Sequence, residues 1–529
     1  MSRINTNISS MIAQRVLNQN NNALNTSLER LSTGLAINRG KDNPAGLIAS
    51  QNLRAEISAV GAAVKNAERA DQVVNIAEGG LSEISSMLTE LQALVTTTAN
   101  TGGLSVEERE ANQLQIDSIL QTIDRIAAAT SFQGTKLLNG NFDYTVSNVA
   151  GAVDSFKVNG AKLEFNGTRD VEVVVTGSAR VGGFLLSFGS ANINLGGAGS
   201  ADGANEQFVI EITGAKGSRE LSFASGTNVS DMINAINSFS DVTGVSASLS
   251  GASGIRLTSV ERSGSDFVSI RVIDDGDIDG AAGIYGLSSG TVDFADTGNV
   301  TAFSAASNKL TSKGSDVQAT INGIVATTRG TVARINTDFL DVQIDLKYDT
   351  STTSAANLGA LTAFKITGGG ADFQLAGRVD IAGRVGVGIT NVAVRELGRS
   401  NIDVITDAGT ATNAKTNQTF NLNELRAGAS LNVVDGNMDA AQSVVERAIR
   451  EVSSLRGRLG SFQQNTIGAT VRSLGVSIEN TAAAESVIRD TDFATETASL
   501  TRSQVLASSA QQALSLANFQ PQNALQLLG

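Results

Sequence analysis

The strongest helical periodicity of the chain lies at residues 438–487, which read MDAAQSVVERAIREVSSLRGRLGSFQQNTIGATVRSLGVSIENTAAAESV. Alternating steps of three and four residues from Met438 meet an apolar side chain at most positions. A seven-residue repeat this long predicts a coiled-coil seam on one helix of about 75 Å, at ~1.5 Å per residue. Glycines between Gly457 and Gly475 weaken the repeat, because each costs roughly 1 kcal/mol relative to alanine. The predicted seam comprises Met438, Ala441, Val445, Ala448, Val452, Leu455, Leu459, Phe462, Thr466, Ala469, Ser473, Val476, Asn480, Ala483 and Val487.

Partner helices are predicted nearer the N-terminus. Asn43 can cap a helix whose first residue is Pro44, where a missing N–H costs little. Apolar residues at helical spacing then run from 57 to 95. Ser105 and Glu108 have the spacing of a capping box and so begin another helix. Three long helices with short connections predict a bundle.

The outermost ends carry narrow apolar stripes at residues 1–35 and 500–528. Such a stripe buries little in an isolated helix, so these segments should gain order against other helices, within the chain or between copies. Two ordinary amphipathic helices docked on the bundle are the alternative. The candidate interface residues are Leu17, Leu24, Leu28, Leu31, Leu35, Leu500, Leu506, Ala510, Leu514, Ala517, Leu525 and Leu528.

The middle of the chain alternates apolar and polar residues, as strands do. Phe208, Ile210 and Ile212 share one face, and Val342 and Ile344 share another. Residues 206–273 read strand, strand, helix, strand, strand, strand, with Asn228 capping the helix. With residues 1–140 and about 415–529 helical, the sequence predicts an α+β multidomain protein. Its termini build a long α-helical coiled-coil bundle, and β-rich outer domains are inserted between them.

Composition excludes several classes of function. The chain has 529 residues, no Cys and no His, which excludes disulfides, thiolate nucleophiles and His-based catalytic or metal sites. A net charge of −13 argues against nucleic acid as a partner. No apolar stretch approaches the ~18 residues of a membrane span, and the N-terminus lacks the apolar core of a secretory signal. We therefore expect no enzyme activity, no cofactor and no membrane insertion.

The acidic stretch Asp275, Asp277 and Asp279, followed by Gly280, matches the first half of a calcium loop. The twelfth position of such a loop should be a bidentate Glu, but here it is Gly286. We interpret the stretch as a solvated acidic turn, and the sequence leaves calcium binding open.

Short motifs at both ends resemble bacterial flagellin. They are NTN at 5–7, LSTGLAIN at 31–38, KDNPAGL at 41–47, AEGGLSEI at 77–84, IRDTDFA at 488–494 and PQNALQLL at 521–528. Within the insert, residues 226–237 and 243–245 resemble a repeat module of flagellins and hook-associated proteins.

The resemblance implies a homopolymeric filament subunit for motility. It implies core coiled-coil segments at 1–42 and 486–529, two halves of a helical domain at 43–145 and 366–485, and outer variable domains at 146–365 with a repeat module at 206–275. It also implies unfolded export without a cleaved signal, and an extracellular location in the flagellum. Expected partners are the flagellar export apparatus, an export chaperone, the cap and hook-associated proteins.

One departure from the family concerns an animal Toll-like flagellin receptor. Flagellins that it detects carry Gln-Arg-Val-Arg-Glu-Leu, where this chain has TELQAL at 89–94. Glu90, Gln92 and Ala93 replace the charged residues of that motif, so we expect poor detection.

Two alternatives to a filament subunit remain. A hook–filament junction protein shares the terminal plan and would occupy one ring rather than a long polymer. An adhesin role for residues 146–365 is the second.

Overall fold

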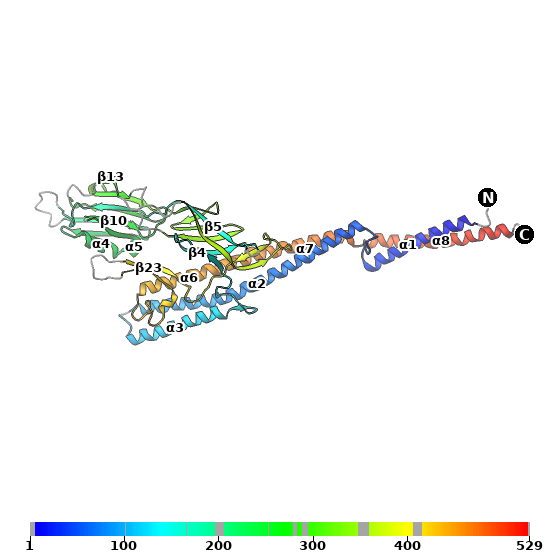
Figure 1. The fold of residues 1–529 in the computed structure, drawn as a ribbon, viewed down its shortest axis with the longest axis horizontal. Coiled ribbons are helices and arrows are strands. Elements are labelled where there is room, and N and C mark those ends of the chain that lie inside the picture. Colours follow the sequence, from blue (N-terminus) through cyan, green and yellow to red (C-terminus); the bar gives the residue numbers. More distant parts are fainter. Residues whose placement is uncertain are drawn as a thin grey trace. The chain divides into compact units, whose positions relative to one another are not determined.

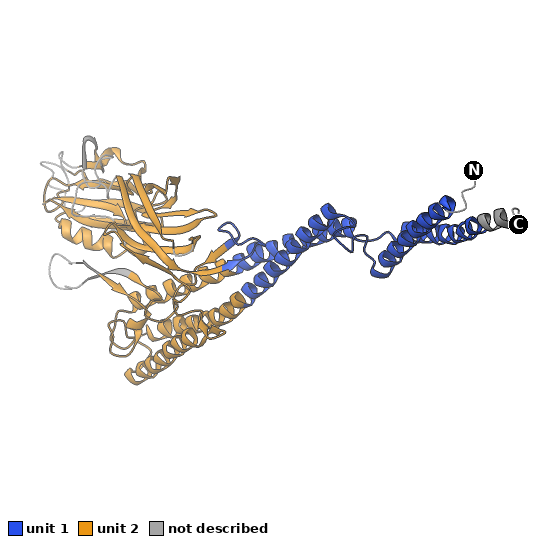
Figure 2. Cartoon of the chain, turned by 45° about the vertical axis from the view of Figure 1, so that its right-hand side comes forward, with its two compact units in different colours: residues 1–72, 373–384, 460–529 blue, residues 73–372, 385–459 orange. Residues whose placement is uncertain are grey.

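The computed structural model describes residues 6–100, 102–164, 167–195, 206–251, 253–278, 283–287, 295–347, 359–405 and 415–526. These fall into two compact units (Figure 2). Unit 1 comprises residues 1–72, 373–384 and 460–529, and unit 2 comprises residues 73–372 and 385–459. Both chain ends are helical and the middle is β-rich, as predicted (Figure 1).

The long helices begin at the predicted signals. Asn43 Oδ1 accepts a hydrogen bond from the Gly46 N–H at 2.9 Å, and Ser105 and Glu108 form the predicted capping box. The helices are α1 (Ile8–Thr33), α2 (Pro44–Thr98), α3 (Val106–Ala129), α6 (Met438–Ser461), α7 (Gly468–Arg489) and α8 (Phe493–Gln526), with a π-helix, η3 (Phe462–Ile467), between α6 and α7.

In unit 2, apolar faces of α2, α3 and α6 are buried at helical spacing, which confirms the predicted helix faces. The ion pair between Arg456 Nε and Glu78 Oε1, at 2.8 Å, joins α6 to α2. The buried residues include Val74, Ala77, Leu81, Ile84, Leu88, Leu91 and Val95 of α2, Ile116, Ile119 and Ile123 of α3, and Val445, Ala448, Val452, Leu455 and Leu459 of α6.

A proximal β body follows α3 and packs around one core that contains Val173, Val342 and Phe364. Its two antiparallel sheets have the orders β16-β15-β5-β20-β3 and β17-β18-β19-β4. The strands are β3 (Tyr144–Ser147), β4 (Val153–Ala161), β5 (Arg169–Gly177), β15 (Gln318–Ile321), β16 (Ile324–Val325), β17 (Thr327–Arg329), β18 (Val332–Asn336), β19 (Leu340–Leu346) and β20 (Gly359–Gly369).

A distal β body has a separate core, in which the Phe188, Phe208 and Phe303 rings lie 5.1–5.6 Å apart. The predicted order of elements in 206–273, with Asn228 as the helix cap, agrees with the structure except that a second short helix, at 240–243, follows the predicted one. Its sheets are β13-β12-β6-β10-β9 and β14-β11-β7-β8. Its elements are β6 (Gly183–Ser187), β7 (Gln207–Gly214), β8 (Ser218–Ala224), α4 (Val229–Asn237), α5 (Ser240–Thr243), β9 (Val245–Ser250), β10 (Gly254–Ser259), β11 (Phe267–Asp274), β12 (Gly283–Leu287), β13 (Ala295–Thr301), η1 (Phe303–Ala305) and β14 (Leu310–Lys313).

The prediction that the C-terminal helical part begins near residue 415 is wrong. A strand at 415–420 and a short 3₁₀ turn, which Asn421 caps and whose Leu422 and Leu425 are buried, precede α6. The remaining elements are the pairs β1 (Ser131–Phe132) and β2 (Thr135–Lys136), β21 (Ala371–Gln374) and β22 (Arg384–Val387), β23 (Ser400–Ile405) and β24 (Lys415–Phe420), with the turn η2 (Leu422–Leu425).

The predicted seam of 438–487 is confirmed as far as Phe462 and wrong beyond it. Ile467 is buried in place of Thr466, while Val476 and Val487 are exposed. A π-helix takes one residue more per turn than an α-helix, so η3 moves the covered face one residue along the chain. The half-buried positions of α7 include 471, 474, 478, 481, 485 and 488, which continue the spacing from Ile467.

Candidate assembly interface

Helices α1 and α8 of unit 1 lie side by side and antiparallel (Figure 1). Asn7 Nδ2 donates to the Ala517 carbonyl at 2.8 Å, and Asn20 Nδ2 donates to the Leu506 carbonyl at 3.2 Å. At the other end of the pair, the Ala36 N–H donates to the Arg489 carbonyl at 2.7 Å. The N-cap Asn7 and Asn20 of α1 therefore bond across the pair, a role that the abundance of asparagine alone did not reveal.

Small residues form the buried line between these two helices. Ser27, Ser503, Ala510 and Ala517 are buried, so the helix backbones can approach closely. Most predicted leucines flank this line and are half-buried, namely Leu17, Leu24, Leu31, Leu35, Leu500 and Leu514. Leu28 and Leu506 are exposed. The side chain of Leu525 and the whole of Leu528 lie outside the described residues.

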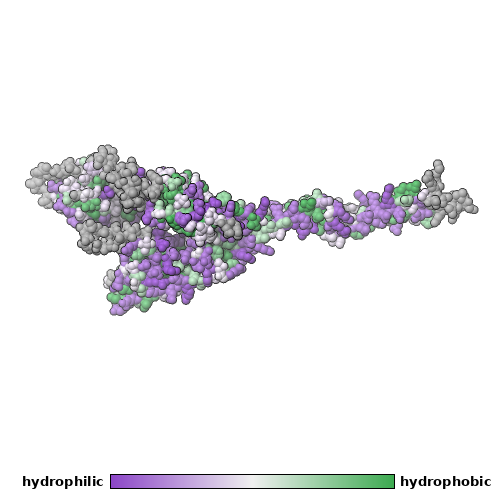
Figure 3. Space-filling model, in the orientation of Figure 1, coloured by the Kyte–Doolittle hydropathy of each residue, from purple (hydrophilic) through white to green (hydrophobic). Residues whose placement is uncertain are grey.

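A second set of apolar side chains on the same two helices faces solvent. Ile8 and Met11 of α1 are 60% and 66% exposed, and Leu516 and Phe519 of α8 are 66% and 56% exposed. Figure 3 shows apolar residues on the surface of this pair near its free end. Large apolar side chains gathered on an exposed surface mark an interaction site. The leucine stripe did not include this set, although Ile8, Met11 and Ile12 already have helical spacing in the sequence.

The turn from α1 to α2 is held by local hydrogen bonds. Gly34 ends α1 with a φ of 73°, a conformation that glycine adopts without strain. The Asp42 carboxylate accepts from the N–H groups of Arg39 and Asn38 at 2.7 and 3.2 Å. These bonds, that from Arg39 above all, hold the pKa of the Asp42 carboxyl below its usual value.

The start of α8 is fixed in a similar way. The Asp492 carboxylate accepts from the Thr495 hydroxyl at 2.7 Å and from the Ala494 N–H at 3.0 Å. The bond from the Thr495 hydroxyl contributes most to lowering the pKa of this carboxyl. Glu496, in the first turn of α8, lies 3.6 Å from Arg30 of α1. These contacts set where the antiparallel pair begins.

The three residues that depart from the receptor motif lie on α2 within unit 2. Glu90 is exposed and accepts a hydrogen bond from Gln115 Nε2 at 3.1 Å, while Ala93 is exposed and Gln92 half-buried. Leu91 between them is buried in the helical bundle. The changed positions therefore belong to the surface of the helix, where they can alter recognition without altering the core.

Asp275 and Asp277 lie in a turn after β11, whereas Asp279 lies outside the described residues. Asp277 has a φ of 47°, and the Gly276 N–H donates to Asp274 Oδ1 at 3.1 Å. Within the described ranges, no three His, Cys, Asp or Glu side chains gather as a metal ion would need. The helices described there also include none that is long and apolar enough to cross a membrane.

Comparison with known proteins addresses the terminal segments and the distal β body. The family model of the bacterial flagellin N-terminal helical region matches residues 4–143, and that of the C-terminal helical region matches residues 442–528. The flagellin hook IN motif matches residues 207–261. Together these matches span more than half of the chain.

Curated relatives match along nearly the whole chain. Flagellin B of Helicobacter pylori is 28% identical, and the B-type flagellin of Pseudomonas aeruginosa is 29% identical, each over 99% of both chains. A solved structure of FliC from Burkholderia pseudomallei covers 75% of this chain and 99% of its own at 12% identity, with a TM-score of 0.22. The family assignment rests on the sequence matches, and by them this chain belongs to the bacterial flagellin family and is a structural subunit of the flagellar filament.

Proposed function

We propose that copies of this chain polymerise through the exposed apolar face of the α1–α8 pair. The observation that carries the proposal is the exposure of Ile8, Met11, Leu516 and Phe519 on two helices whose shared line is already buried. Burial of apolar surface contributes about 25 cal/mol per Å². Each of these side chains can therefore contribute to association once neighbouring pairs cover it.

The predicted interface residues take two roles in this proposal. Leu17, Leu24, Leu31, Leu500 and Leu514 hold α1 against α8 and complete their burial between neighbours. Leu28 and Leu506, which are exposed, face those neighbours directly. Contacts between different surfaces of identical copies generate an open helix when the rotation from one copy to the next does not close into a ring.

The proposal includes a route to the cell exterior. The chain passes unfolded through the flagellar export apparatus with an export chaperone, and it folds beneath the cap beyond the hook-associated proteins. Its composition supports this route. With no Cys and only two Pro, neither disulfide exchange nor slow proline isomerisation hinders refolding.

Electron microscopy of purified monomer after seeding tests the proposal, with a parallel sample that lacks residues 1–40 and 486–529. We expect long filaments from the intact chain only. Filaments from the truncated chain would place the essential contacts elsewhere. If neither sample gave filaments, a hook–filament junction protein, which needs the hook as template, would replace the proposed polymer.

A further inference from the structure

Unit 1 carries a second pair of complementary surfaces away from the α1–α8 pair. One is a projecting turn between β21 and β22, residues 374–383, which we call the Val379 turn. The other is a groove between α2 and the start of α7, which we call the π-turn groove. Both belong to unit 1, and neither belongs to the apolar face described above.

The Val379 turn is rigid and presents an apolar tip. The Asp380 N–H donates to the Arg378 carbonyl at 3.2 Å, which reverses the chain with Val379 at the apex. Gln374 Nε2 donates to the same carbonyl at 2.6 Å, and Asp380 Oδ1 accepts from the Gly383 N–H at 2.6 Å. Val379 is nevertheless 82% exposed. A preorganised turn loses little entropy on binding, so an exposed valine on it is suited to insert into a partner.

Close packing holds the base of this turn on α2. A Cβ on Gly383 would lie 2.6 Å from Gln374 Nε2, so only glycine fits there. A Cβ on Gly377 would lie 3.3 Å from Val60 Cγ2 of α2, and Asn66 Nδ2 donates to the Gln374 carbonyl at 3.4 Å. The turn is therefore anchored beside one stretch of α2 and displays its tip away from that anchor.

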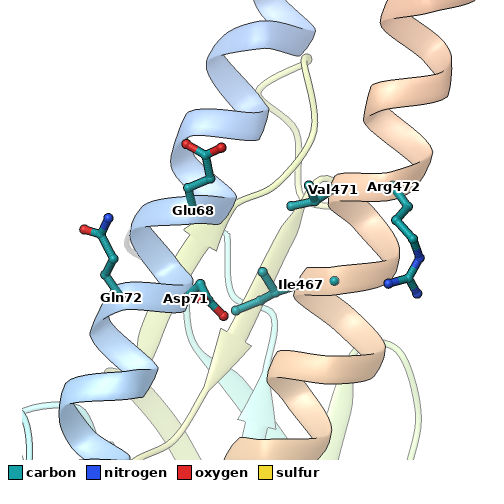
Figure 4. A pocket seen from close by; sticks show the side chains of 7 residues that line it. Glu68, Asp71, Gln72, Ile467, Val471 and Arg472 are labelled. Carbon is teal, nitrogen blue, oxygen red and sulfur yellow. The ribbon is translucent and has the colours of Figure 1, made fainter.

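The π-turn groove has about 540 Å³ of space and lies between α2, at residues 68–72, and the start of α7 (Figure 4). Its apolar lining comprises the half-buried Val471 and Ile467, which is only 2% exposed, and Gly468 adds no side chain to it. The extra residue of η3 brings Ile467 to this position, where it faces Asp71 across the gap in Figure 4. The other lining residues are Glu68, Gln72 and Arg472.

Charge in the groove is divided between its two helices. Glu68 and Asp71 place carboxylates on the α2 side, and Arg472 places a guanidinium on the α7 side. The Val379 turn has the matching order, with Arg378 and Asp380 on either side of an apolar residue. The turn therefore complements the groove in the order of its charges and in its apolar centre.

We propose that the Val379 turn of one copy inserts into the π-turn groove of a second copy. Val379 packs on Val471, Arg378 faces Glu68 and Asp71, and Asp380 faces Arg472. The turn and the groove are different surfaces of one chain, so each copy can engage one neighbour with its turn and another with its groove. This contact joins two different surfaces and is compatible with an open filament, and the inference rests on the proposed polymerisation.

Disulfide trapping tests the contact cleanly, because the chain has no Cys of its own. Filaments of the full-length double variant Val379→Cys/Val471→Cys should give a ladder of linked oligomers on mild oxidation, whereas dilute monomer should not. Val379→Cys/Val476→Cys is the matched control, since Val476 is an exposed valine of α7 outside the groove. Filaments without a ladder, or a product that stops at dimer, would overturn the contact.

A charge-reversal series decides the question if the cysteine variant fails to polymerise. Arg378→Glu should slow seeded elongation at least about ten-fold, because it sets like charges together in the groove. Adding Glu68→Arg to Arg378→Glu should restore most of the rate. Equal elongation by Arg378→Glu and the unchanged chain would refute the inference. Absence of filaments from the unchanged chain would instead refute the polymerisation on which it rests.

Discussion

At the scale of the residue, the buried hydroxyl of Tyr144 links two strands of the proximal β body. Tyr144 starts β3, and its hydroxyl donates to the Ala161 carbonyl at 3.2 Å and accepts from the Ala161 N–H at 2.9 Å. One phenol thus satisfies both backbone groups of a residue in β4. Burial raises the pKa of Tyr144 to about 12, although the hydrogen bond to Ala161 lowers it.

Replacing Tyr144 by Phe should destabilise the proximal β body by about 1–3 kcal/mol, because both backbone groups of Ala161 lose their partner. The loss should depend on pH. The unfolded phenol ionises near pH 10 and the folded one near pH 12. The stabilisation is therefore complete below pH 10 and is lost as the pH rises to 12. Urea unfolding followed by circular dichroism at pH 9 to 12 should show the unchanged chain and Tyr144→Phe converging.

Tyr285→Phe is the matched control, since it removes a half-buried phenol from β12 of the distal β body. It should leave the pH dependence of the proximal β body intact. Parallel curves for the unchanged chain and Tyr144→Phe across this pH range would contradict the assignment of the high pKa to Tyr144.

We also expect receptor detection to depend on single residues. The unchanged chain should give a weak response in reporter cells, because Glu90 reverses a charge and Ala93 removes one. Introducing Glu90→Arg, Gln92→Arg and Ala93→Glu should raise the response, since these positions lie on the helix surface and can change without repacking. Glu83→Arg, an exposed change on the same helix, is the control. A full response to the unchanged chain at ordinary doses would refute this expectation.

At the scale of the element, helix faces decide what is covered. The α1–α8 pair buries a line of small residues and leaves larger apolar ones outside. Along 438–489, the π-helix η3 accommodates one extra residue between α6 and α7. The buried side chains before and after it therefore stay on one side of the helix. A regular seven-residue repeat would have produced neither the exposed apolar face of the α1–α8 pair nor the π-turn groove.

Leu514→Asp should abolish polymerisation, because it places a charge at a half-buried position beside the small residues that are buried between α1 and α8. Sedimentation and electron microscopy after seeding measure this directly. Gln512→Asp, an exposed change on the same helix, should still polymerise. Filaments of normal length from Leu514→Asp would show that this face is not an interface.

Deleting Gln464 should be tolerated better than deleting Ser473, although both residues are exposed. The first deletion removes the extra residue of η3 and leaves a continuous seven-residue repeat through 467, 471 and 474. The second rotates the rest of α7 by about 100° and exposes its covered face. Urea midpoints of the two variants measure the difference. A larger loss for the Gln464 deletion would mean that the π-turn itself is needed for stability.

At the scale of the whole molecule, the distal β body joins the proximal one through two adjacent chain segments, which pair at Arg180 and Ser315. The Arg180 N–H donates to the Ser315 carbonyl at 2.9 Å, and the Ser315 N–H donates back to the Arg180 carbonyl at 3.0 Å. Asp316 Oδ1 accepts from the N–H groups of Gly264 and Gly330 at 2.9 and 2.6 Å, and so ties a distal loop to a proximal turn.

A chain in which a short Gly-Ser link replaces residues 181–314 should fold and form filaments, because Arg180 and Ser315 already lie side by side. The proximal β body keeps its own core. Electron microscopy should show thinner filaments of ordinary length. A link of the same length in place of residues 153–346 is the control and should fail, because it removes most of that core. Failure of the first variant alone would mean that the distal β body takes part in assembly.

Local signals in the sequence determined most of the elements. Asn43-Pro44 and the Ser105–Glu108 box placed helix starts, period-two alternation placed β7 and β19, and the seven-residue repeat placed α6. Each signal lies within a few residues of its effect, because caps, turns and strand alternation are local in the chain. The leucines of the terminal stripes were found in the same way.

Tertiary structure decided the rest. Ser27 is buried beside α8, and the covered face shifts by one residue at η3. Glu68, Ile467 and Arg472 line one groove. These contacts involve residues that lie hundreds of positions apart in the chain. A helical period states which residues share a face, but not which partner covers that face or where one extra residue is accommodated. Those outcomes depend on packing between helices from the two ends of the chain, which no local pattern contains.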